Sequence, residues 1–393
     1  MANTNLVIDM VTREALRIAH EKLSFIGTID RQYDDSFAVT GGKIGSTLRI
    51  RQPNQFTRRT GSRVMDVQDV TETAITATVA TQDGVDIRFN SSELALDIDE
   101  LSRRYIEPAV AVLVSGIEGD MLSAVTKEIH NLAGTAGTPP ADLAAIGAAR
   151  AKLNQGLAPK DGQRCVQMDS VTMGTMVNGL KGLFQDSQQI KEQYREGMIG
   201  RTGMADFYEN ERTYTHTNGA DVVGAVNETA IASGDTTIVV DGMTAAAAVG
   251  SVFTFDATYA VHPETKVAYS HLQQFTVTAA TTTLLTFTPA MILTGPKQNI
   301  DALPSDDDVI TFVGSLSTAY RHNLMYHKEA FTFITADLPI MDDALKCVRR
   351  SRDGLSLRCW QASDIRNDEM LMRLDILYGW KTLRPEWACR ITS

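Results

Sequence analysis

Apolar and polar residues alternate through residues 37–90, and turn-forming residues interrupt the alternation. Short alternating runs at 48–50 and 64–67 lie on either side of the irregular segment QPNQFTRRTG. Two longer alternating runs follow, and they are separated by Asp83 and Gly84. A period of two places successive side chains on opposite faces of a strand. We therefore predict two β-hairpins, the second of which turns at Asp83 and Gly84.

A three- and four-residue period replaces the alternation at residues 97–133, the strongest helical signal in the chain. Apolar residues recur at helical spacing from Ile106 to Ile129. Pro108 would break or kink the first turns, so the regular helix should run from about there to His130. A weaker helical pattern at 8–24 predicts a short, partly apolar helix, which is either an arm that docks on another surface or a plain core helix.

The second half of the chain predicts a mixed α/β unit interrupted by a β domain. Helices at 141–157 and 171–184 flank a strand at 164–169. From about 216 to 312, β-rich runs such as TTIVVDG and VGSVFTF alternate with turns, which is typical of a small inserted barrel or sandwich. The acidic linker PSDDD ends it, strands FTFIT and LSLRCWQ follow, and the run from Met370 to Thr392 alternates as one long strand. The predicted fold class is α+β.

Composition excludes several classes of protein. The 393 residues carry a formal net charge of −11, which argues against a protein that grips nucleic acid over its whole surface. No run of eighteen apolar residues and no secretory leader occur, so we expect a soluble protein, made in the cytosol, with no membrane association. The four cysteines form no CxxC pair and are expected to be buried free thiols.

A cationic segment stands out against this acidic background. No acidic residue occurs between Ser36 and Met65, and the segment contains Arg49, Arg51, Arg58, Arg59 and Arg63. An extended, arginine-rich hairpin has little apolar face of its own to bury, so it is suited to lying on another surface. Nucleic acid is the alternative partner, but Phe56 is the one aromatic residue among these arginines.

No pattern in the chain predicts catalysis, a cofactor or a metal. The glycines of GMIGRTG lack the GK[ST] ending of a phosphate loop, and no GxSxG nucleophile motif occurs. His322 and His327 do not share a helical face, and His262 and His271 flank a loop. The acidic triplets at 97–100 and 306–308 lack calcium-loop spacing. The expected catalytic, cofactor and metal sites are therefore none.

Four stretches carry a family resemblance. They are GSTLRIRQPNQFTRR at 45–59, GVDIRFNSSELALDIDELSRRYIEPAV at 84–110, YREGMIGRTGMADFYENE at 194–211 and LYGWKTLRPEWACRI at 377–391. They resemble the major coat proteins of short-tailed phages typified by Salmonella phage P22, which have the HK97-type capsid fold. The dipeptide Arg384–Pro385 resembles a motif in the closing strand of such subunits.

The resemblance implies a division of the chain into six segments. These are an N-terminal arm at 1–36, an extended loop at 37–96, a peripheral domain with a spine helix at 97–135, a first axial part at 136–215, an inserted β domain at 216–315, and a return to the axial domain with the closing strand of the peripheral domain at 316–393. The arm would contact neighbours through Arg13, Glu14 and Arg17, and the extended loop through the five arginines.

The function implied is a major capsid protein whose pentamers and hexamers form a T=7 icosahedral shell. Its expected partners are copies of itself, a scaffolding protein and a portal. The shell would be assembled in the cytoplasm of the host bacterium and would enclose double-stranded DNA without sequence-specific binding. The alternatives are an encapsulin-like compartment, a β-rich phage tail or adhesion protein that binds host glycans and, more remotely, a soluble enzyme.

Overall fold

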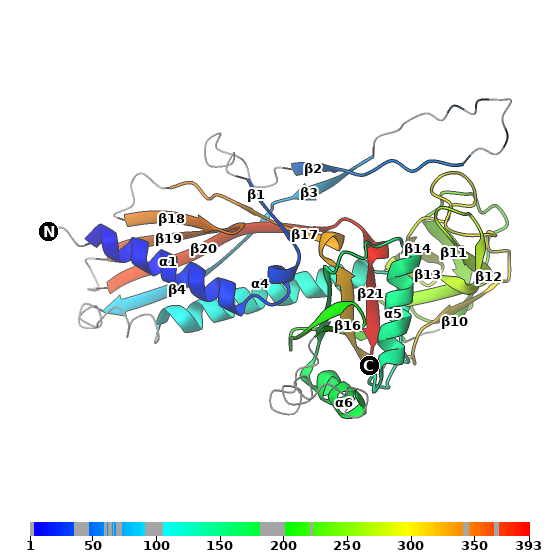
Figure 1. The fold of residues 1–393 in the computed structure, drawn as a ribbon, viewed down its shortest axis with the longest axis horizontal. Coiled ribbons are helices and arrows are strands. Elements are labelled where there is room, and N and C mark those ends of the chain that lie inside the picture. Colours follow the sequence, from blue (N-terminus) through cyan, green and yellow to red (C-terminus); the bar gives the residue numbers. More distant parts are fainter. Residues whose placement is uncertain are drawn as a thin grey trace. The chain divides into compact units, whose positions relative to one another are not determined.

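The computed structural model describes residues 4–34, 47–58, 61, 65, 67, 73–90, 105–180, 201–220, 223–340, 346–364 and 369–393. The chain divides into two compact units. The first comprises residues 1–50, 74–121 and 331–381, and the second comprises residues 51–73, 122–330 and 382–393. Helices and strands both contribute to the core, which confirms the α+β class (Figure 1).

A six-stranded sheet is the centre of the first unit. Its order is β1 (Asp30–Asp34), β17 (Phe331–Ala336), β20 (Glu369–Thr382), β19 (Leu355–Asp364) and β18 (Lys346–Arg352), and β4 (Thr81–Asn90) pairs with β20 as well. β1 runs parallel to β17, whereas β20 is antiparallel to both β19 and β4. The predicted strands FTFIT and LSLRCWQ are confirmed as β17 and β19.

The predicted turn at Asp83 and Gly84 is wrong, because both residues lie inside β4. Gly84 pairs with Asp375 of β20, and a Cβ atom at Gly84 would clash with Oδ1 of that aspartate. The glycine therefore permits a close approach of two strands rather than a turn. The carboxylate that needs this space is buried, and it pairs with Arg358 at 2.7 Å and with Arg373 at 2.6 Å.

The first hairpin has a different return strand from the one predicted. The described strand that pairs with β2 (Thr47–Arg51) is β3 (Ala74–Thr78), whereas the sequence pattern placed the return strand at 64–67, where Val64 and Asp66 lie outside the described residues. Leu48 and Ile50 pack against a buried cluster that includes Ala77 and Ile334. The alternation predicted for β2 is confirmed, but the loop that β2 and β3 enclose is longer than the sequence pattern indicated.

Two helices complete the described part of the first unit, and the second of them extends into the other unit. α1 (Thr4–Lys22) confirms the predicted N-terminal helix and is followed by the 3-10 turn η1 (Ile26–Thr28). α4 (Glu107–Glu128) confirms the long helix, with Pro108 in its first turn, where a missing N–H is tolerated. The buried Glu118 of α4 accepts hydrogen bonds from the backbone N–H groups of Phe25 and Ile26, so it fixes the chain where it leaves α1.

Among the described helices, α4 alone is long and apolar enough to cross a membrane by length and composition. Its window is 56% buried inside the protein, and Val110, Met121 and Val125 recur on its buried side. A core helix has the same length and composition, and the buried carboxylate of Glu118 would be costly in lipid. These features are those of a core helix.

A seven-stranded sheet lies in the second unit. Its order is β5 (Leu132–Ala133), β21 (Ala388–Thr392), β16 (Ala319–His327), β6 (Arg164–Met168), β8 (Ala205–Glu209) and β7 (Arg201–Thr202), and β9 (Tyr214–Thr217) also pairs with β16. α5 (Leu143–Gln155), α6 (Ser170–Leu180) and the 3-10 turn η4 (Lys328–Ala330) accompany the sheet. The predicted helix–strand–helix unit is confirmed.

The last run of the chain is two strands and not one. β20 ends at Thr382, the 3-10 turn η5 (Pro385–Trp387) follows, and β21 joins the seven-stranded sheet. The alternation of residue types continues past the break, although every residue of β21 is buried. The two strands nevertheless belong to different units.

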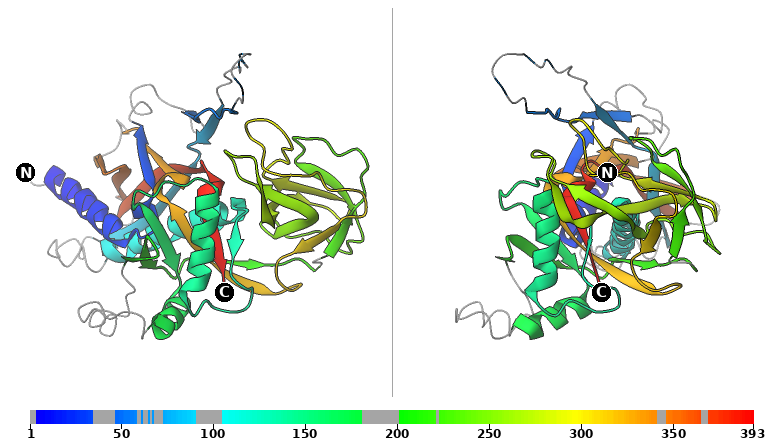
Figure 2. Two further views of the ribbon diagram at one scale, coloured as in Figure 1. Left: turned by 45° about the vertical axis from the view of Figure 1, so that its right-hand side comes forward. Right: turned by 90° about the vertical axis from the view of Figure 1, so that its right-hand side faces the viewer.

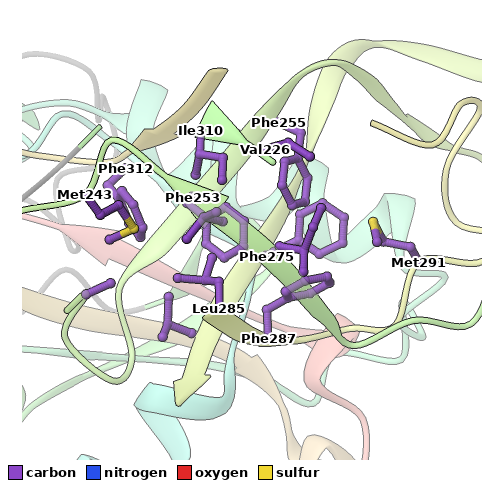
Figure 3. Packing of buried hydrophobic residues seen from close by; sticks show 14 of the residues in the cluster. Val226, Met243, Phe253, Phe255, Phe275, Leu285, Phe287, Met291, Ile310 and Phe312 are labelled. Carbon is purple, nitrogen blue, oxygen red and sulfur yellow. The ribbon is translucent and has the colours of Figure 1, made fainter. Parts of the chain in front are cut away.

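A closed β-barrel also lies in the second unit (Figure 2). Its order is β10 (Val223–Val226), β11 (Thr237–Asp241), β14 (Leu284–Thr288), β13 (Ala268–Ala280), β12 (Val252–Val261) and β15 (Val309–Phe312). Phe253, Phe255, Phe275 and Phe287 fill its interior, with ring centroids 5.2–5.9 Å apart (Figure 3). The predicted barrel is confirmed, and closure leaves no sheet edge open.

We expect Asp375→Asn to lower the free energy of unfolding by about 3–5 kcal/mol, because it leaves the buried guanidinium of Arg358 without its counter-charge. Asp86→Asn is the matched control. That carboxylate also lies near Arg373, at 3.7 Å, but it is largely exposed and should contribute under about 1 kcal/mol. Denaturant unfolding of the purified variants measures both, and equal losses would contradict the assignment.

Candidate interaction surfaces

The β2–β3 hairpin has an apolar face and a cationic face. Leu48 and Ile50 point into the buried cluster of the first unit, whereas Arg49 and Arg51 point to solvent. The strict alternation of the sequence TLRIR produces this division, because successive side chains of a strand point to opposite faces. The hairpin is thus fixed to its own chain by one face and presents guanidinium groups on the other.

The loop beyond the hairpin continues this exposed surface. Gln52 and Thr73 close the loop with a backbone hydrogen bond of 2.9 Å, and the amide of Gln52 donates to the carbonyl of Leu383 at 3.2 Å. Past this closure, Phe56 and Arg58 are exposed. Arg59 and Arg63 lie outside the described residues.

The helix α1 carries the other predicted contact residues. Val11, Leu16 and Ile18 are buried, and α1 packs against β18 and β19 of the same unit. Arg13 and Arg17 are exposed on the opposite side, and Arg17 forms an ion pair with Glu14 at 2.6 Å. Such a pair between neighbouring turns contributes about 0.2–0.5 kcal/mol to the helix. α1 is therefore a helix docked on its own chain, with a charged outer face.

Arg384 and Pro385 lie in the turn between β20 and β21. The guanidinium carbon of Arg384 is 3.9 Å from the ring centre of Trp387, and the indole N–H of Trp387 donates to the carbonyl of Gly156 at 2.9 Å. Pro385 begins η5 with its fixed φ. These contacts hold the turn in place and direct the chain from one sheet into the other.

A buried arginine joins the barrel to the seven-stranded sheet inside the second unit. Arg390 of β21 is fully buried, and its guanidinium donates to the carbonyls of Gly250 and Lys127 and to the hydroxyl of Thr276. Gly250 and Thr276 belong to the barrel region, and Lys127 belongs to the last turn of α4. Burial lowers the pKa of Arg390 to about 9, so the group remains charged at neutral pH. The sequence pattern does not reveal this role, because alternation places Arg390 with Thr392 on the side of the strand opposite Cys389 and Ile391, where an exposed residue is expected.

Three buried histidines surround the same junction. The rings of His216 and His322 lie 5.7 Å apart, and Nε2 of His216 is 2.9 Å from the hydroxyl of Ser251. Burial lowers the pKa of His130 to about 3 and that of His216 to about 4, and it also lowers the pKa of His322; the charge of Arg390 adds to the shift in all three. These imidazoles are therefore neutral at pH 7.

His322 and His327 have different partners in the structure. His322 contacts His216, whereas Nε2 of His327 lies 3.1 Å from a carboxylate oxygen of Asp161. Among the residues that the structure describes, no group of three or more His, Cys, Asp and Glu side chains could hold a metal ion. All four cysteines are free thiols, and burial raises the pKa of both Cys359 and Cys389 to about 12.

The comparisons with known proteins identify the family. A model described as "P22 coat protein - gene protein 5" matches residues 43–390. The match covers most of the chain and identifies the class of protein as a bacteriophage coat protein. The chain belongs to the P22 coat protein family, and it is a major capsid protein, which associates with copies of itself in the capsid of the virion. This is a family of structural proteins and not of enzymes.

Solved structures resemble the chain at low identity. One described as Mycobacterium phage Che8 has 11% identity and a TM-score of 0.48, with 94% of this chain and 90% of that chain covered. The capsid of Ralstonia phage GP4 has 8% identity and a TM-score of 0.44, with 93% and 87% covered. A virus-like particle from Pyrococcus furiosus has 6% identity and a TM-score of 0.40, with 98% of each chain covered. No curated protein matches the chain.

The three buried histidines predict acid sensitivity of the folded subunit. Their pKa values lie below about 6.5 in the fold but return to that value on unfolding, so the unfolded chain binds more protons below pH 6.5. The free energy of unfolding should therefore fall as the pH drops from about 6.5 toward 4.

We expect His322→Gln to reduce the slope of stability against pH in that window by about 1.4 kcal/mol per pH unit. Between pH 7 and 8, where neither state titrates at this position, the variant and the unaltered protein should give parallel curves. Denaturant unfolding across the pH series measures both. Identical slopes below pH 6.5 would contradict the buried neutral state of His322.

Proposed function

We propose that copies of this protein assemble as pentamers and hexamers into a T=7 icosahedral head. Assembly takes place in the cytoplasm of the host bacterium around a scaffolding protein, a portal occupies one vertex, and double-stranded DNA later fills the shell. Membership of the coat protein family supports the proposal. The single observation that carries it is the hairpin of Arg49 and Arg51, which is anchored on one face and leaves a cationic face exposed.

We assign the parts of the chain to the parts of an HK97-type subunit. The first unit, with α1, the hairpin, α4 and the six-stranded sheet, corresponds to the arm, the extended loop, the spine helix and the peripheral domain. The seven-stranded sheet corresponds to the axial domain, and the closed barrel corresponds to the inserted domain. The turn at Arg384–Pro385 joins the peripheral sheet to the axial sheet.

The proposed contacts between subunits are individually weak. Arg49, Arg51, Arg58, Arg59 and Arg63 would lie against acidic groups of the adjacent subunit, and the arm would contribute Arg13, Glu14 and Arg17. An exposed pair contributes only about 0.2–1 kcal/mol, but a closed shell repeats each contact many times. Weak repeated contacts can be corrected during assembly, and the closed product is still stable.

Electron microscopy of the expressed protein tests this function. We expect closed hollow particles, uniform in size when the phage scaffolding protein is co-expressed. Particles whose formation and size never depend on a scaffold would instead favour an encapsulin-like compartment. Elongated or glycan-binding oligomers would favour a tail or adhesion protein, and a monomer at every concentration tried would contradict the proposal.

Reversal of charge on the extended loop should weaken assembly. The variant Arg58→Glu/Arg59→Glu turns two attractive contacts per subunit into repulsive ones. We expect the free energy of association to weaken by about 1–2 kcal/mol, which raises the protein concentration needed for assembly about 5–30-fold. Arg352→Glu, which changes an exposed arginine on β18, is the control and should assemble normally. Light scattering across a NaCl series measures both. Unchanged assembly with unchanged salt dependence would contradict the contact.

A further inference from the structure

The negative charge of the chain is concentrated in the barrel region. Between Thr213 and Tyr320 there are ten Asp and Glu residues but only two lysines, Lys266 and Lys297, so this region carries −8 of the net −11. The segment from Phe37 to Val64 has the opposite character, with Lys43 and five arginines and no acidic residue. Three carboxylates, Asp66, Asp69 and Glu72, follow on the returning half of the loop.

One outer face of the barrel combines exposed apolar side chains with carboxylates. The face runs over β15, β10, β11 and β14, where alternate residues point outward. Val239 lies directly opposite Leu284, and Val309 lies opposite Ala225, which neighbours Val223 two positions along the same strand. Val223 is 53% exposed and Val309 is 46% exposed. We call Val223, Val239, Leu284 and Val309 the barrel face.

Carboxylates lie around the barrel face on two sides. Asp241 is the outward neighbour of Ala225 on β11, and Glu228 accepts the backbone N–H of Val239 at 3.0 Å. The turn at 305–308 is fixed to β10, because the backbone N–H of Asp307 donates to the carbonyl of Val226 at 2.8 Å and the N–H of Val226 donates to the carbonyl of Asp308 at 2.9 Å. This turn presents exposed Asp306 and Asp307 beside the face. Apolar side chains within a carboxylate rim favour a partner that is both apolar and cationic.

The loop between Arg51 and Thr73 has this composition. Beside its arginines it exposes Phe56, Met65 and Val67, with exposed fractions of 61%, 82% and 76%. From the closure at Gln52 and Thr73, a loop with about ten residues in each direction can reach about 33–36 Å. That reach is comparable to the size of a small domain, so the loop can contact a neighbouring subunit.

We propose that the extended loop of one subunit docks on the barrel face of a second copy of this chain. Phe56 and its apolar neighbours cover Val239, Leu284 and Val309, and Arg58 pairs with Asp306 and Asp307. This inference rests on the proposed function, in which the loop arginines contact acidic groups of the adjacent subunit, and it identifies the barrel face as the surface that carries those groups. The contact would place the inserted barrel in the network of contacts that holds the shell together.

The test uses the full-length protein with the charges exchanged. Arg58→Glu and Asp306→Lys/Asp307→Lys are each expected to raise the concentration needed for assembly at least threefold. The combination of all three changes should restore it to within twofold of the unaltered protein. Glu264→Lys, at an exposed barrel turn between β12 and β13, is the matched control and should leave assembly unchanged. Thermal unfolding of every variant separates lost assembly from lost folding.

Mixing the two defective proteins distinguishes a contact between copies from one within a copy. A subunit with Arg58→Glu and one with Asp306→Lys/Asp307→Lys can pair only across subunits, so the mixture should assemble better than either variant alone. Rescue in the combined variant without rescue in the mixture would overturn the inference. The inference would also be overturned if Asp306→Lys/Asp307→Lys left assembly unchanged, even if that variant no longer bound another phage protein.

The apolar part of the contact has its own measurement. Phe56→Ser and Leu284→Ser should each weaken assembly, and their effects should not add, because both remove the same contact. Independent effects would overturn the inference. Failure of the unaltered protein to form shells would instead contradict the proposed function, so the two failures are distinguishable.

Discussion

The burial of a charged guanidinium at Arg390 constrains the whole second unit. An ion removed from water is costly unless donors and acceptors replace its hydration, and here the replacing acceptors come from three separate segments of chain. The end of α4, the loop before β12 and the strand β13 must therefore all be in place before the charge is satisfied. Because this requirement links the barrel to the seven-stranded sheet, the barrel is fixed to that sheet within the second unit.

The neutral histidines follow from the same constraint. His130, His216 and His322 lie near a fixed positive charge in a dry environment, so protonation would add repulsion to the cost of burial. The junction is stable while they are neutral. The junction is therefore a region of the second unit whose stability depends on pH.

The first unit also contains a buried charge, and there an ion pair balances it. Asp375 is buried between Arg358 and Arg373, and Gly84 gives its carboxylate room on the neighbouring strand. The strand that carries Asp375 also pairs with β4, which follows the cationic hairpin in the chain. The hairpin that carries the exposed Arg49 packs through Leu48 and Ile50 against a buried cluster of this unit. This division suits a subunit in which strong interactions maintain the fold and weak ones maintain the shell.

The sequence by itself determined the fold class, the long helix from Glu107, the barrel and the alternation of TLRIR, because these depend on local periodicity. It did not determine which strands pair, since β3 returns from β2 and since the last alternating run is split between two sheets. Gly84 and Arg390 show the physical reason. In the sequence, Gly84 has the character of a turn residue and Arg390 that of an exposed residue. Their actual roles depend on neighbours that are distant in the chain, namely Asp375 for Gly84 and Gly250 for Arg390.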